Sequence, residues 1–444
     1  MALLKTKISQ GEIQGVVKDC CTVFRGVPYA QPPVGNLRFQ APKPPLPWNG
    51  TYPADHFPNI CWQDESETDG FYAKEFYSAE EFRTTPSEDC LYLNIWTPAQ
   101  TSDERLPVAL WIHGGAFTHG NGHESEFDGE AYCRRGVILV TINYRLGVFG
   151  YLAHPWLSAE NPLHISGNYG CLDQIAALKW VHENISAFGG DPDNITLFGQ
   201  SAGAMSTQTL VSSPLTSDWI SKAIFQSAGG YHTGFNQDIT LAQAEKTGEN
   251  FVSFAGISSL EELRRQDARE LCRLASAYMK SHPEQLLTFV PNIDGHLLTD
   301  GYDSCIEQGS VKDIPYMLGS TLNDIAVDTT PSAEGPRSRL YYGCIAWSHM
   351  LEELGRLPAY VYDFQRQLPG DDAGAFHSSE LWYMFGTLSR CWRPMTNADY
   401  RLSERMLDCW TNFMKYGNPN GHEAPVEVWR PCRRDDPYVQ TFNL

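Results

Sequence analysis

Gly199-Gln200-Ser201-Ala202-Gly203 is a G-x-S-x-G sequence, in which two glycines flank a serine. A strand is predicted over residues 194–198 before it, and a helix is predicted to begin at Ala202. The glycines relieve the crowding of a very tight strand-to-helix turn, which leaves the serine hydroxyl exposed above a sheet on a strained backbone. We therefore predict that Ser201 is a nucleophile. Ser227, in a similar sequence that lacks the first glycine, is not expected to be one.

A serine hydroxyl needs a base and hydrogen-bond donors for the oxyanion before it can attack a carbonyl group efficiently. The sequence His113-Gly114-Gly115-Ala116-Phe117 directly follows an apolar run. Paired glycines after a strand allow backbone N–H groups to point at a small anion. We predict that the N–H groups of Gly114, Gly115 and Ala202 form an oxyanion hole.

Strands and helices in alternation must position these groups. Nearly continuous apolar runs, typical of strands buried on both faces, cover residues 106–112 and 136–142, and further strands are predicted over residues 194–198 and 222–226. Apolar residues at helical spacing extend from Cys171 to Ile185, and Gly189-Gly190-Asp191-Pro192 ends that helix. This alternation indicates parallel βαβ units, so the predicted fold class is α/β, with a mostly parallel central sheet flanked by helices.

Residues 238–290 have a different character, because they show polar amphipathic helices and few strand signals. The length of 444 residues alone suggests two or three domains at about 150 residues each, but large α/β enzymes exceed that size as one unit. We predict a single catalytic domain over residues 1–444, with residues 238–290 forming a helical cap within it.

Charge and composition exclude several classes of protein. Lys+Arg number 33 and Asp+Glu 53, giving a net charge of −20, which argues against binding to nucleic acid or to an anionic membrane surface. The 12 cysteines form no C-x-x-C pair, so no zinc site or thioredoxin-type motif is predicted. Neither a signal peptide nor a membrane span is found. We expect a cytoplasmic protein with mostly free thiols, although a trimmed secreted form would look the same.

Three motifs in order carry a resemblance that covers nearly the whole chain. They are Phe24-Arg25-Gly26-Val27-Pro28-Tyr29-Ala30-Gln31-Pro32-Pro33-Val34-Gly35, Ser87-Glu88-Asp89-Cys90-Leu91-Tyr92-Leu93-Asn94, and the serine motif of residues 199–203. The chain resembles the type-B carboxylesterases, the α/β-hydrolase family that includes bacterial esterases, liver carboxylesterases and cholinesterases. The resemblance implies an α/β-hydrolase fold with a Ser-acid-His triad in that chain order.

The same resemblance supplies candidates for the base and the acid. Residues 374–381 resemble the histidine loop of the family, which makes His377 the general base, a role that suits the ordinary pKa of histidine. Residues 318–324 resemble the strand end where the family usually has Glu followed by Gly. Here Asp324 and Ile325 occupy these positions, so Asp324 is the predicted acid and Asp328 is its nearby rival.

Departures from the cholinesterase pattern bear on the substrate. Gln200 stands where cholinesterases carry Glu, and residues 67–76 contain no Trp on which a cation could stack. A neutral ester with short acyl or aromatic groups is therefore favoured over a choline ester. The predicted substrate-binding residues are Phe117, Gln200, Met205, Tyr231, Trp382 and Phe385, although each aromatic or methionine could equally belong to the core.

Other matches to the family imply structural contacts. Arg38 with Glu88, and Arg145 with Asp173, resemble its buried ion pairs, which need have no catalytic role. Secreted relatives join the cysteine of the second motif to one upstream. Cys61 and Cys90 match that pair in order and spacing, but the absence of a signal peptide leaves the bridge open.

We therefore expect a serine carboxylester hydrolase that acts on a small-molecule ester through an acyl-enzyme, with no metal or organic cofactor. The alternatives are a catalytically silent, cholinesterase-like adhesion or scaffold protein, and a thioesterase or amidase that uses the same triad.

Overall fold

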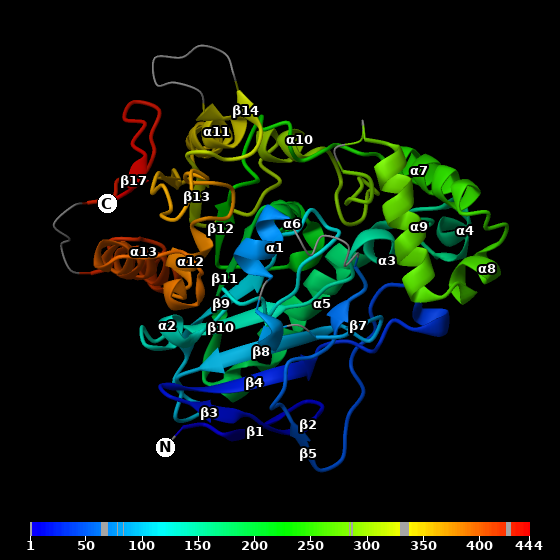
Figure 1. Cartoon of the computed structure of the whole chain (residues 1–444), viewed down its shortest axis with the longest axis horizontal. Coiled ribbons are helices and arrows are strands. Elements are labelled where there is room, and N and C mark those ends of the chain that lie inside the picture. The colour runs from blue at the N-terminus through cyan, green and yellow to red at the C-terminus, as the bar shows by residue number, and fades with distance from the viewer. Residues whose placement is uncertain are drawn as a thin grey trace.

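The structure is a computed structural model that describes residues 2–63, 70–77, 79–82, 84–283, 285, 287–328, 337–422 and 428–444, with only the backbone at 81, 327 and 328. A large twisted sheet runs through the molecule, with helices on both of its faces (Figure 1). In this described part, no helix has the length and apolar character needed to cross a bilayer.

The central sheet has ten strands among the described residues. In spatial order they are β17 (Gln440–Phe442), β16 (Tyr360–Phe364), β13 (Tyr316–Thr321), β12 (Lys222–Gln226), β11 (Gly190–Gln200), β9 (Leu106–Ile112), β10 (Ile138–Ile142), β8 (Tyr92–Thr97), β4 (Cys21–Pro28) and β3 (Val16–Lys18). Neighbours from β17 to β10 are parallel, and β8, β4 and β3 continue the sheet with antiparallel pairing. The predicted mostly parallel sheet is confirmed.

Small sheets lie outside it. One contains β1 (Lys5–Ile8), β2 (Gly11–Gln14) and β5 (Thr51–Pro53), and two pairs are formed by β6 (Ile60–Cys61) with β7 (Pro86–Ser87), and by β14 (Val327–Asp328) with β15 (Arg337–Ser338).

The apolar runs are continuous because both faces of the sheet are buried. In β9, Val108, Leu110 and Ile112 belong to one hydrophobic cluster, and Ala109 and Trp111 belong to the cluster on the opposite face. Side chains alternate between the faces of a strand, so every position of β9 needs an apolar residue.

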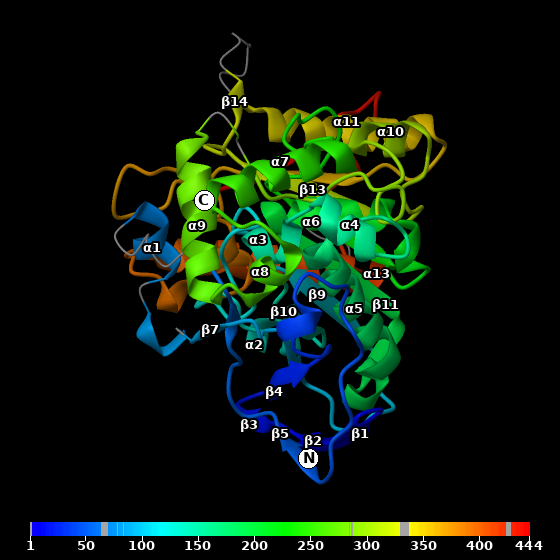
Figure 2. The same cartoon turned by 90° about the vertical axis from the view of Figure 1, so that its right-hand side faces the viewer.

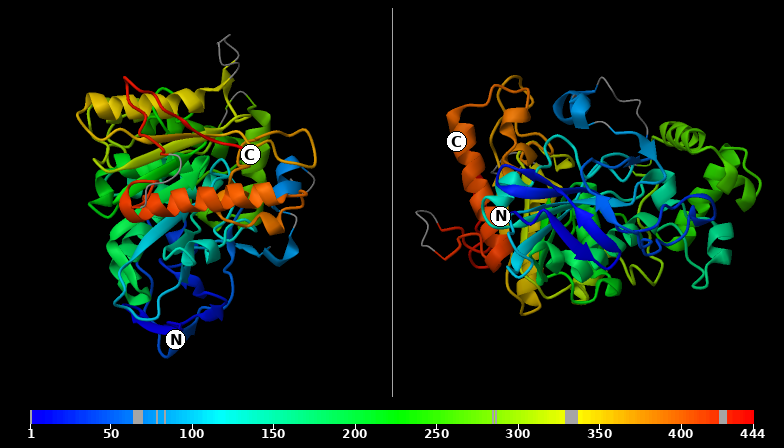
Figure 3. Two further views of the ribbon diagram at one scale, coloured as in Figure 1. Left: turned by 90° about the vertical axis from the view of Figure 1, so that its left-hand side faces the viewer. Right: turned by 90° about the horizontal axis from the view of Figure 1, so that it is seen from below.

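Two groups of helices cover these faces. On one face lie α5 (Tyr169–Asn184), α6 (Ala202–Ser212) and α11 (Arg339–Glu353), with α3 (Gly147–Tyr151) against α5 and α10 (Tyr302–Glu307) against α6. On the other lie α2 (Glu130–Cys133) and α13 (Asn397–Tyr416), with α12 (Leu381–Met384) against α13. Figure 3 shows α13 crossing that second face.

Residues 238–290 form the predicted helical region, and their described part contains α7 (Leu241–Phe254), α8 (Leu260–Arg265) and α9 (Ala268–Ser281). Thr240 caps α7 in a capping box with Gln243, and Ser259 and Asp267 cap α8 and α9. Figure 2 shows these helices in front of the sheet, beside α4 (Pro155–Glu160).

Shorter elements and boundaries complete the fold. They are α1 (Phe71–Phe76) and the 3-10 turns η1 (Gly35–Leu37), η2 (Glu80–Phe82), η3 (Ile185–Phe188), η4 (Pro214–Thr216) and η5 (Leu388–Arg390). The predicted helix stop is confirmed, because η3 ends at Phe188 and Gly189 caps it with a φ of 81°. The predicted strand over 194–198 is longer, because Gly190 already pairs with Leu106, with an irregularity before Ile195.

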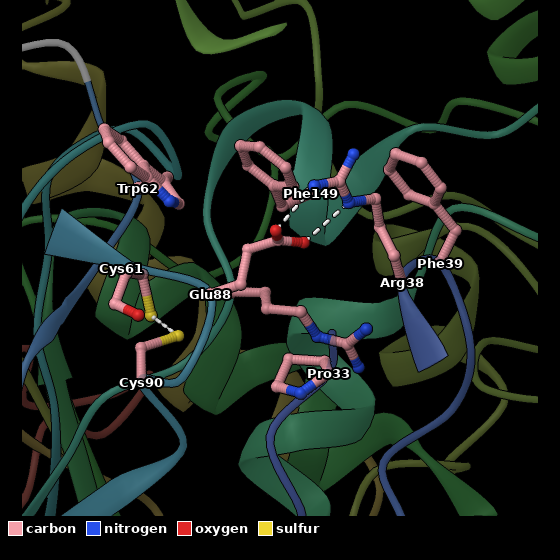
Figure 4. A pocket seen from close by; sticks show the side chains of 10 residues that line it. Pro33, Arg38, Phe39, Cys61, Trp62, Glu88, Cys90 and Phe149 are labelled. Carbon is pink, nitrogen blue, oxygen red and sulfur yellow. Dashed lines mark hydrogen bonds and ion pairs between the residues drawn. The ribbon is translucent and has the colours of Figure 1, made fainter. Parts of the chain in front are cut away.

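Both predicted ion pairs are present. Arg38 Nε lies 2.6 Å from Glu88 Oε1, and Arg145 Nη2 lies 2.7 Å from Asp173 Oδ1. Figure 4 shows the first pair in a small pocket near Cys61 and Cys90. The two sulfur atoms are 2.7 Å apart, and both residues are free thiols in this structure, so the bridge that the sequence left open is not formed here.

Candidate active site

The turn that carries Ser201 has the strained geometry predicted for it. Strand β11 ends at Gln200 and α6 begins at Ala202, and Ser201 between them has a φ of 55° and a ψ of −127°. A Cβ atom on Gly199 would lie 2.4 Å from the carbonyl carbon of Gly203, and one on Gly203 would lie 2.0 Å from the Ile112 oxygen. Both glycines are therefore required by close packing at this turn.

The loop after β9 lies against this turn. A Cβ atom on Gly114 would be 3.2 Å from Ser201 Cβ, and Gly115, Ala116 and Phe117 all have positive φ angles. Among the described residues, the backbone N–H groups of Gly114, Gly115 and Ala116 have no backbone acceptor. Ala202 opens α6, so its N–H lies in the first helical turn, where no intrahelical acceptor exists. These N–H groups are candidate donors to an oxyanion, and Ala116 is one that the sequence analysis missed.

His377 and Asp324 come together although 53 residues separate them. His377 Nδ1 lies 2.6 Å from Asp324 Oδ1, and both side chains are almost completely buried. Asp324 follows β13 and His377 follows β16, so both stand beyond the carboxyl ends of parallel strands, as Ser201 does after β11. The carboxyl ends of parallel strands meet at one edge of the sheet, which explains how three distant residues can share a site.

Asn323 braces the histidine loop beside the acid. Its N–H donates to the Ala375 carbonyl (3.0 Å), and its Oδ1 accepts the N–H of Ala375 (2.9 Å). Asp324 is fixed in turn, because its Oδ2 accepts the Thr321 N–H (3.0 Å) and its Oδ1 accepts the Ile325 N–H (2.8 Å).

The second nitrogen of the imidazole faces the residue before the serine. Gln200 Nε2 lies 3.1 Å from His377 Nε2. With Nδ1–H donating to Asp324, Nε2 is an acceptor, and the Gln200 amide donates to it. Among the described residues, Ser201 Oγ makes no hydrogen bond of its own.

The two buried histidines near the serine, His377 and His113, have pKa values shifted in opposite directions. Burial lowers the pKa of His377, but the carboxylates of Asp324 and Glu380 outweigh this effect, and the net pKa lies above the ordinary value of 6.5. Burial lowers the pKa of His113 to about 3, and its ring stacks on Tyr144. His113 is therefore neutral, and its Nδ1 hydrogen bonds to the Gly114 carbonyl oxygen (2.8 Å).

Glu380 is a further acidic group that no sequence signal indicated. Its side chain is completely buried three residues after His377, where Oε1 accepts a hydrogen bond from Gln226 Nε2 (3.3 Å). Burial, reinforced by the Asp324 charge, raises the pKa of Glu380 to about 7. It therefore titrates in the range where His377 works.

The predicted pocket walls have mixed surroundings. Phe117 and Met205 are buried on the α6 face, and Phe117 packs edge-on against Tyr151. Trp382 and Phe385 lie in the opposite hydrophobic cluster, where Phe385 contacts Trp111 as a core residue does.

The remaining candidates are placed as follows. The Tyr231 hydroxyl donates a hydrogen bond to the Glu307 carboxylate (2.7 Å). Ser227 is fully buried, and the side chain of Asp328 lies outside the described residues. No group of three or more His, Cys, Asp or Glu side chains suited to a metal ion occurs in the part of the chain that the structure describes.

A cavity of about 490 Å³ is lined mostly by the described part of residues 234–290, with Tyr151 of α3 in its wall. Its lining contains amide, hydroxyl and apolar groups and, among the described residues, no charged side chain: Tyr151, Gly234, Gln237, Ile239, Gln243, Ala244, Thr247, Gln285, Leu287, Thr288, Phe289 and Val290. Tyr151 connects it to the loop after β9 through its contact with Phe117.

A mostly parallel sheet with a strained serine turn, and with an acid and a histidine beyond later strands, defines an α/β-hydrolase. The model of the "Carboxylesterase family" matches residues 3–339 and 340–443, and the chain belongs to this family as a carboxylic ester hydrolase. It is 33% identical over 456 residues to the para-nitrobenzyl esterase of Bacillus subtilis, covering 92% of this chain and 89% of that protein.

Two further comparisons agree with membership of this family. The chain is 30% identical over 511 residues to a cholinesterase of Mus musculus, covering 99% of this chain and 82% of that protein. The solved structure of a thermophilic PNB esterase superimposes with a TM-score of 0.86 at 31% identity, covering 100% of this chain and 96% of the other.

Proposed function

We propose that this protein hydrolyses neutral aryl and short-chain carboxylic esters through an acyl-enzyme on Ser201. The contact between His377 and Asp324, next to the Ser201 turn, is the observation that carries the proposal. The name of the para-nitrobenzyl esterase supports an aromatic ester group.

In the first step, Ser201 Oγ forms a bond to the carbonyl carbon of the ester while its proton passes to His377 Nε2. The C–O bond to the alcohol then breaks, and His377 returns the proton to the leaving oxygen. Water repeats the sequence and releases the acid. Asp324 holds the ring in the tautomer that leaves Nε2 free to accept the proton.

The Gln200 contact adds one requirement to this cycle. Gln200 Nε2 occupies the acceptor side of His377, so the ring must exchange this contact for the Ser201 hydroxyl before attack. The oxyanion that forms is held by N–H groups of Gly114, Gly115 and Ala202, with Ala116 as a further donor.

The described residues that line the 490 Å³ cavity carry no charged side chain, which supports a neutral substrate. We propose that residues 238–290 act as a cap on a single domain, and that one arm of the ester extends under this cap. A cationic ester would find no carboxylate at position 200, where Gln200 is neutral.

The test is release of p-nitrophenol from p-nitrophenyl esters of graded acyl length by the wild type and by Ser201→Ala. We expect turnover by the wild type, fastest with short acyl groups, and at least a 10³-fold loss in the variant. Absence of turnover in the wild type, or equal turnover in the variant, contradicts the proposal.

A further inference from the structure

Glu75 of α1 is buried, and its hydrogen-bond partners come from a distant part of the sequence. Its side chain is 1% exposed and accepts hydrogen bonds from four side chains more than 300 residues later, one of them the Cys391 thiol, whose Sγ lies 3.7 Å from Oε1. Trp382 Nε1 donates to Oε1 (3.2 Å), Trp392 Nε1 donates to Oε2 (2.9 Å), and Arg393 Nε contacts both oxygens at 2.9 and 3.1 Å. A buried carboxylate with this many donors is held in one position.

Arg393, whose side chain is completely buried, extends this contact to the segment before His377. Its Nη1 donates to Asp371 Oδ1 (2.7 Å) and to the Pro369 carbonyl (3.1 Å), and its Nη2 donates to Asp371 Oδ2 (3.2 Å). Pro369 and Asp371 precede His377, and Trp382 follows it. Glu75 and Arg393 together therefore fix both arms of the loop that carries the histidine.

Direct contacts with the histidine segment complete the arrangement. The Arg393 guanidinium lies 5.1 Å from the ring centroid of Phe376, the residue before His377. From α1, the Phe71 ring packs edge-on against Phe376 at 4.9 Å, and the Tyr72 hydroxyl donates to the His377 carbonyl (3.4 Å). Contacts from α1 thus reach the backbone of the histidine itself.

The loop needs such support because of its length and composition. It runs from the end of β16 at Phe364 to the start of α12 at Leu381, and Gly370 and Gly374 in it have φ angles of 109° and 71°. A glycine-containing loop of this length has many accessible conformations. A displacement of about 1 Å at a catalytic group can cost about 100-fold in rate.

We propose that Glu75 and Arg393 are positioning residues, which hold the loop of residues 369–382 so that the His377 imidazole faces the Ser201 turn. This inference rests on the proposed function, because it gives the pair a role only if His377 is the base.

The Arg38–Glu88 pair supplies a matched control. It is also a bidentate Arg–Glu pair, with the Arg38 and Glu88 side chains 8% and 15% exposed, and it contacts the carbonyl of Gln266 and no residue of the histidine loop (Figure 4). Removing the charge of either glutamate leaves a buried arginine underpaired, so both Glu75→Gln and Glu88→Gln should lower the thermal midpoint.

The experiment compares these two variants with the wild type for thermal midpoint, kcat and KM with a p-nitrophenyl ester, well below every midpoint. We expect Glu75→Gln to lower kcat about 10- to 100-fold with KM changed less than about threefold, and Glu88→Gln to change kcat less than about twofold. Equal kcat values for the two variants, or a change in KM alone, would overturn the proposal.

The pH profile gives a readout that simple destabilisation does not move. The titratable groups that face His377 are Asp324, Glu380 and, at its backbone, Tyr72, while the neutral Gln200 amide contacts its Nε2. Because the Asp324 contact raises the pKa of His377, a displaced loop should move the acidic limb of kcat/KM in Glu75→Gln to lower pH. A limb that stays in place contradicts the positioning role.

A milder variant covers the case in which Glu75→Gln does not fold. Trp392 is 39% exposed, and Trp392→Phe removes one donor to Glu75 while keeping a ring. It should lower kcat about two- to fivefold with an unchanged fold, and an unaltered kcat counts against the proposal.

In the same assay, activity retained by Ser201→Ala means that the proposed function has failed. An inactive Ser201→Ala beside a fully active Glu75→Gln means that only the positioning role has failed.

Discussion

Asp324 Oδ1 contacts His377 Nδ1 at 2.6 Å although an aspartate stands where this family usually has glutamate. The side chain of aspartate is one methylene shorter than that of glutamate, and here it still reaches the imidazole. Asp324 lies in the bend directly after β13, where the Thr321 and Ile325 N–H groups fix its two oxygens and Asn323 draws the histidine loop toward it. An aspartate can therefore orient the imidazole here.

This geometry predicts which acid matters. Asp324→Asn should lower kcat about 10³- to 10⁴-fold, because an amide favours the wrong imidazole tautomer. Asp328→Asn, four residues later, should keep kcat within about twofold. Steady-state kinetics with one p-nitrophenyl ester decide the matter, and a large loss at Asp328 alone would show that Asp324 is not the acid.

The Gln200 contact predicts a shift in the pH profile. Catalysis needs neutral His377, so kcat/KM should rise with pH through the raised pKa of His377, above 6.5. Gln200→Glu places a negative charge beside Nε2, which stabilises the imidazolium and should move the acidic limb to still higher pH. An acidic limb that is unchanged, or that moves downward, contradicts the contact between Gln200 and His377.

The neutral residue at position 200 also predicts substrate choice. The wild type should hydrolyse 3,3-dimethylbutyl acetate with a higher kcat/KM than acetylcholine, its cationic isostere. Gln200→Glu should reduce that preference severalfold, since the new carboxylate attracts the cation. Measurement of kcat/KM for both esters, at a pH above the acidic limb of each enzyme, tests this, and a wild-type preference for acetylcholine would refute the neutral-ester assignment.

Glu380 predicts a pH dependence of stability. Its pKa is about 7 in the folded protein against an ordinary value of 4.5, so the ionised form is disfavoured by folding. Protonated Glu380 therefore contributes fully to the free energy of unfolding below about pH 4.5. This contribution is lost as the pH rises through about 7, a change of roughly 3 kcal/mol. In the wild type, the free energy of unfolding should therefore fall between about pH 5 and pH 8. In Glu380→Gln, this fall should be smaller by roughly 3 kcal/mol.

Denaturant unfolding at these two pH values measures the effect. The exposed Glu261→Gln, which changes a surface carboxylate, serves as the control and should leave the decrease as it is in the wild type. An identical pH dependence in Glu380→Gln and the wild type would mean that Glu380 is already ionised in the folded protein.

Much of the central sheet could be predicted because its signals are local. The run at 106–112 matches β9 residue for residue, since strands buried on both faces need continuous apolar sequence, and the strand predicted over 222–226 matches β12. The beginning of β11 was missed because Pro192 indicates a break, whereas the strand accommodates it beside an irregularity.

The site was less accessible to sequence analysis where it depends on tertiary contacts. The Ser201 turn has its own glycines, which close packing requires. Glu380 and Glu75 show no local pattern, because their importance comes from burial and from partners up to 318 residues away. Ala116 was missed because only the folded structure shows that its N–H has no backbone acceptor among the described residues.

The central claim is that Ser201 carries the acyl group. Rapid mixing of wild-type enzyme with excess p-nitrophenyl acetate, followed by acid quench and mass spectrometry of peptides, tests it most directly. We predict a burst of one p-nitrophenol per active chain and one acetyl group on the peptide that contains Ser201, with neither in Ser201→Ala. A burst in that variant, or an acetyl group on another residue of the wild type, would contradict the account.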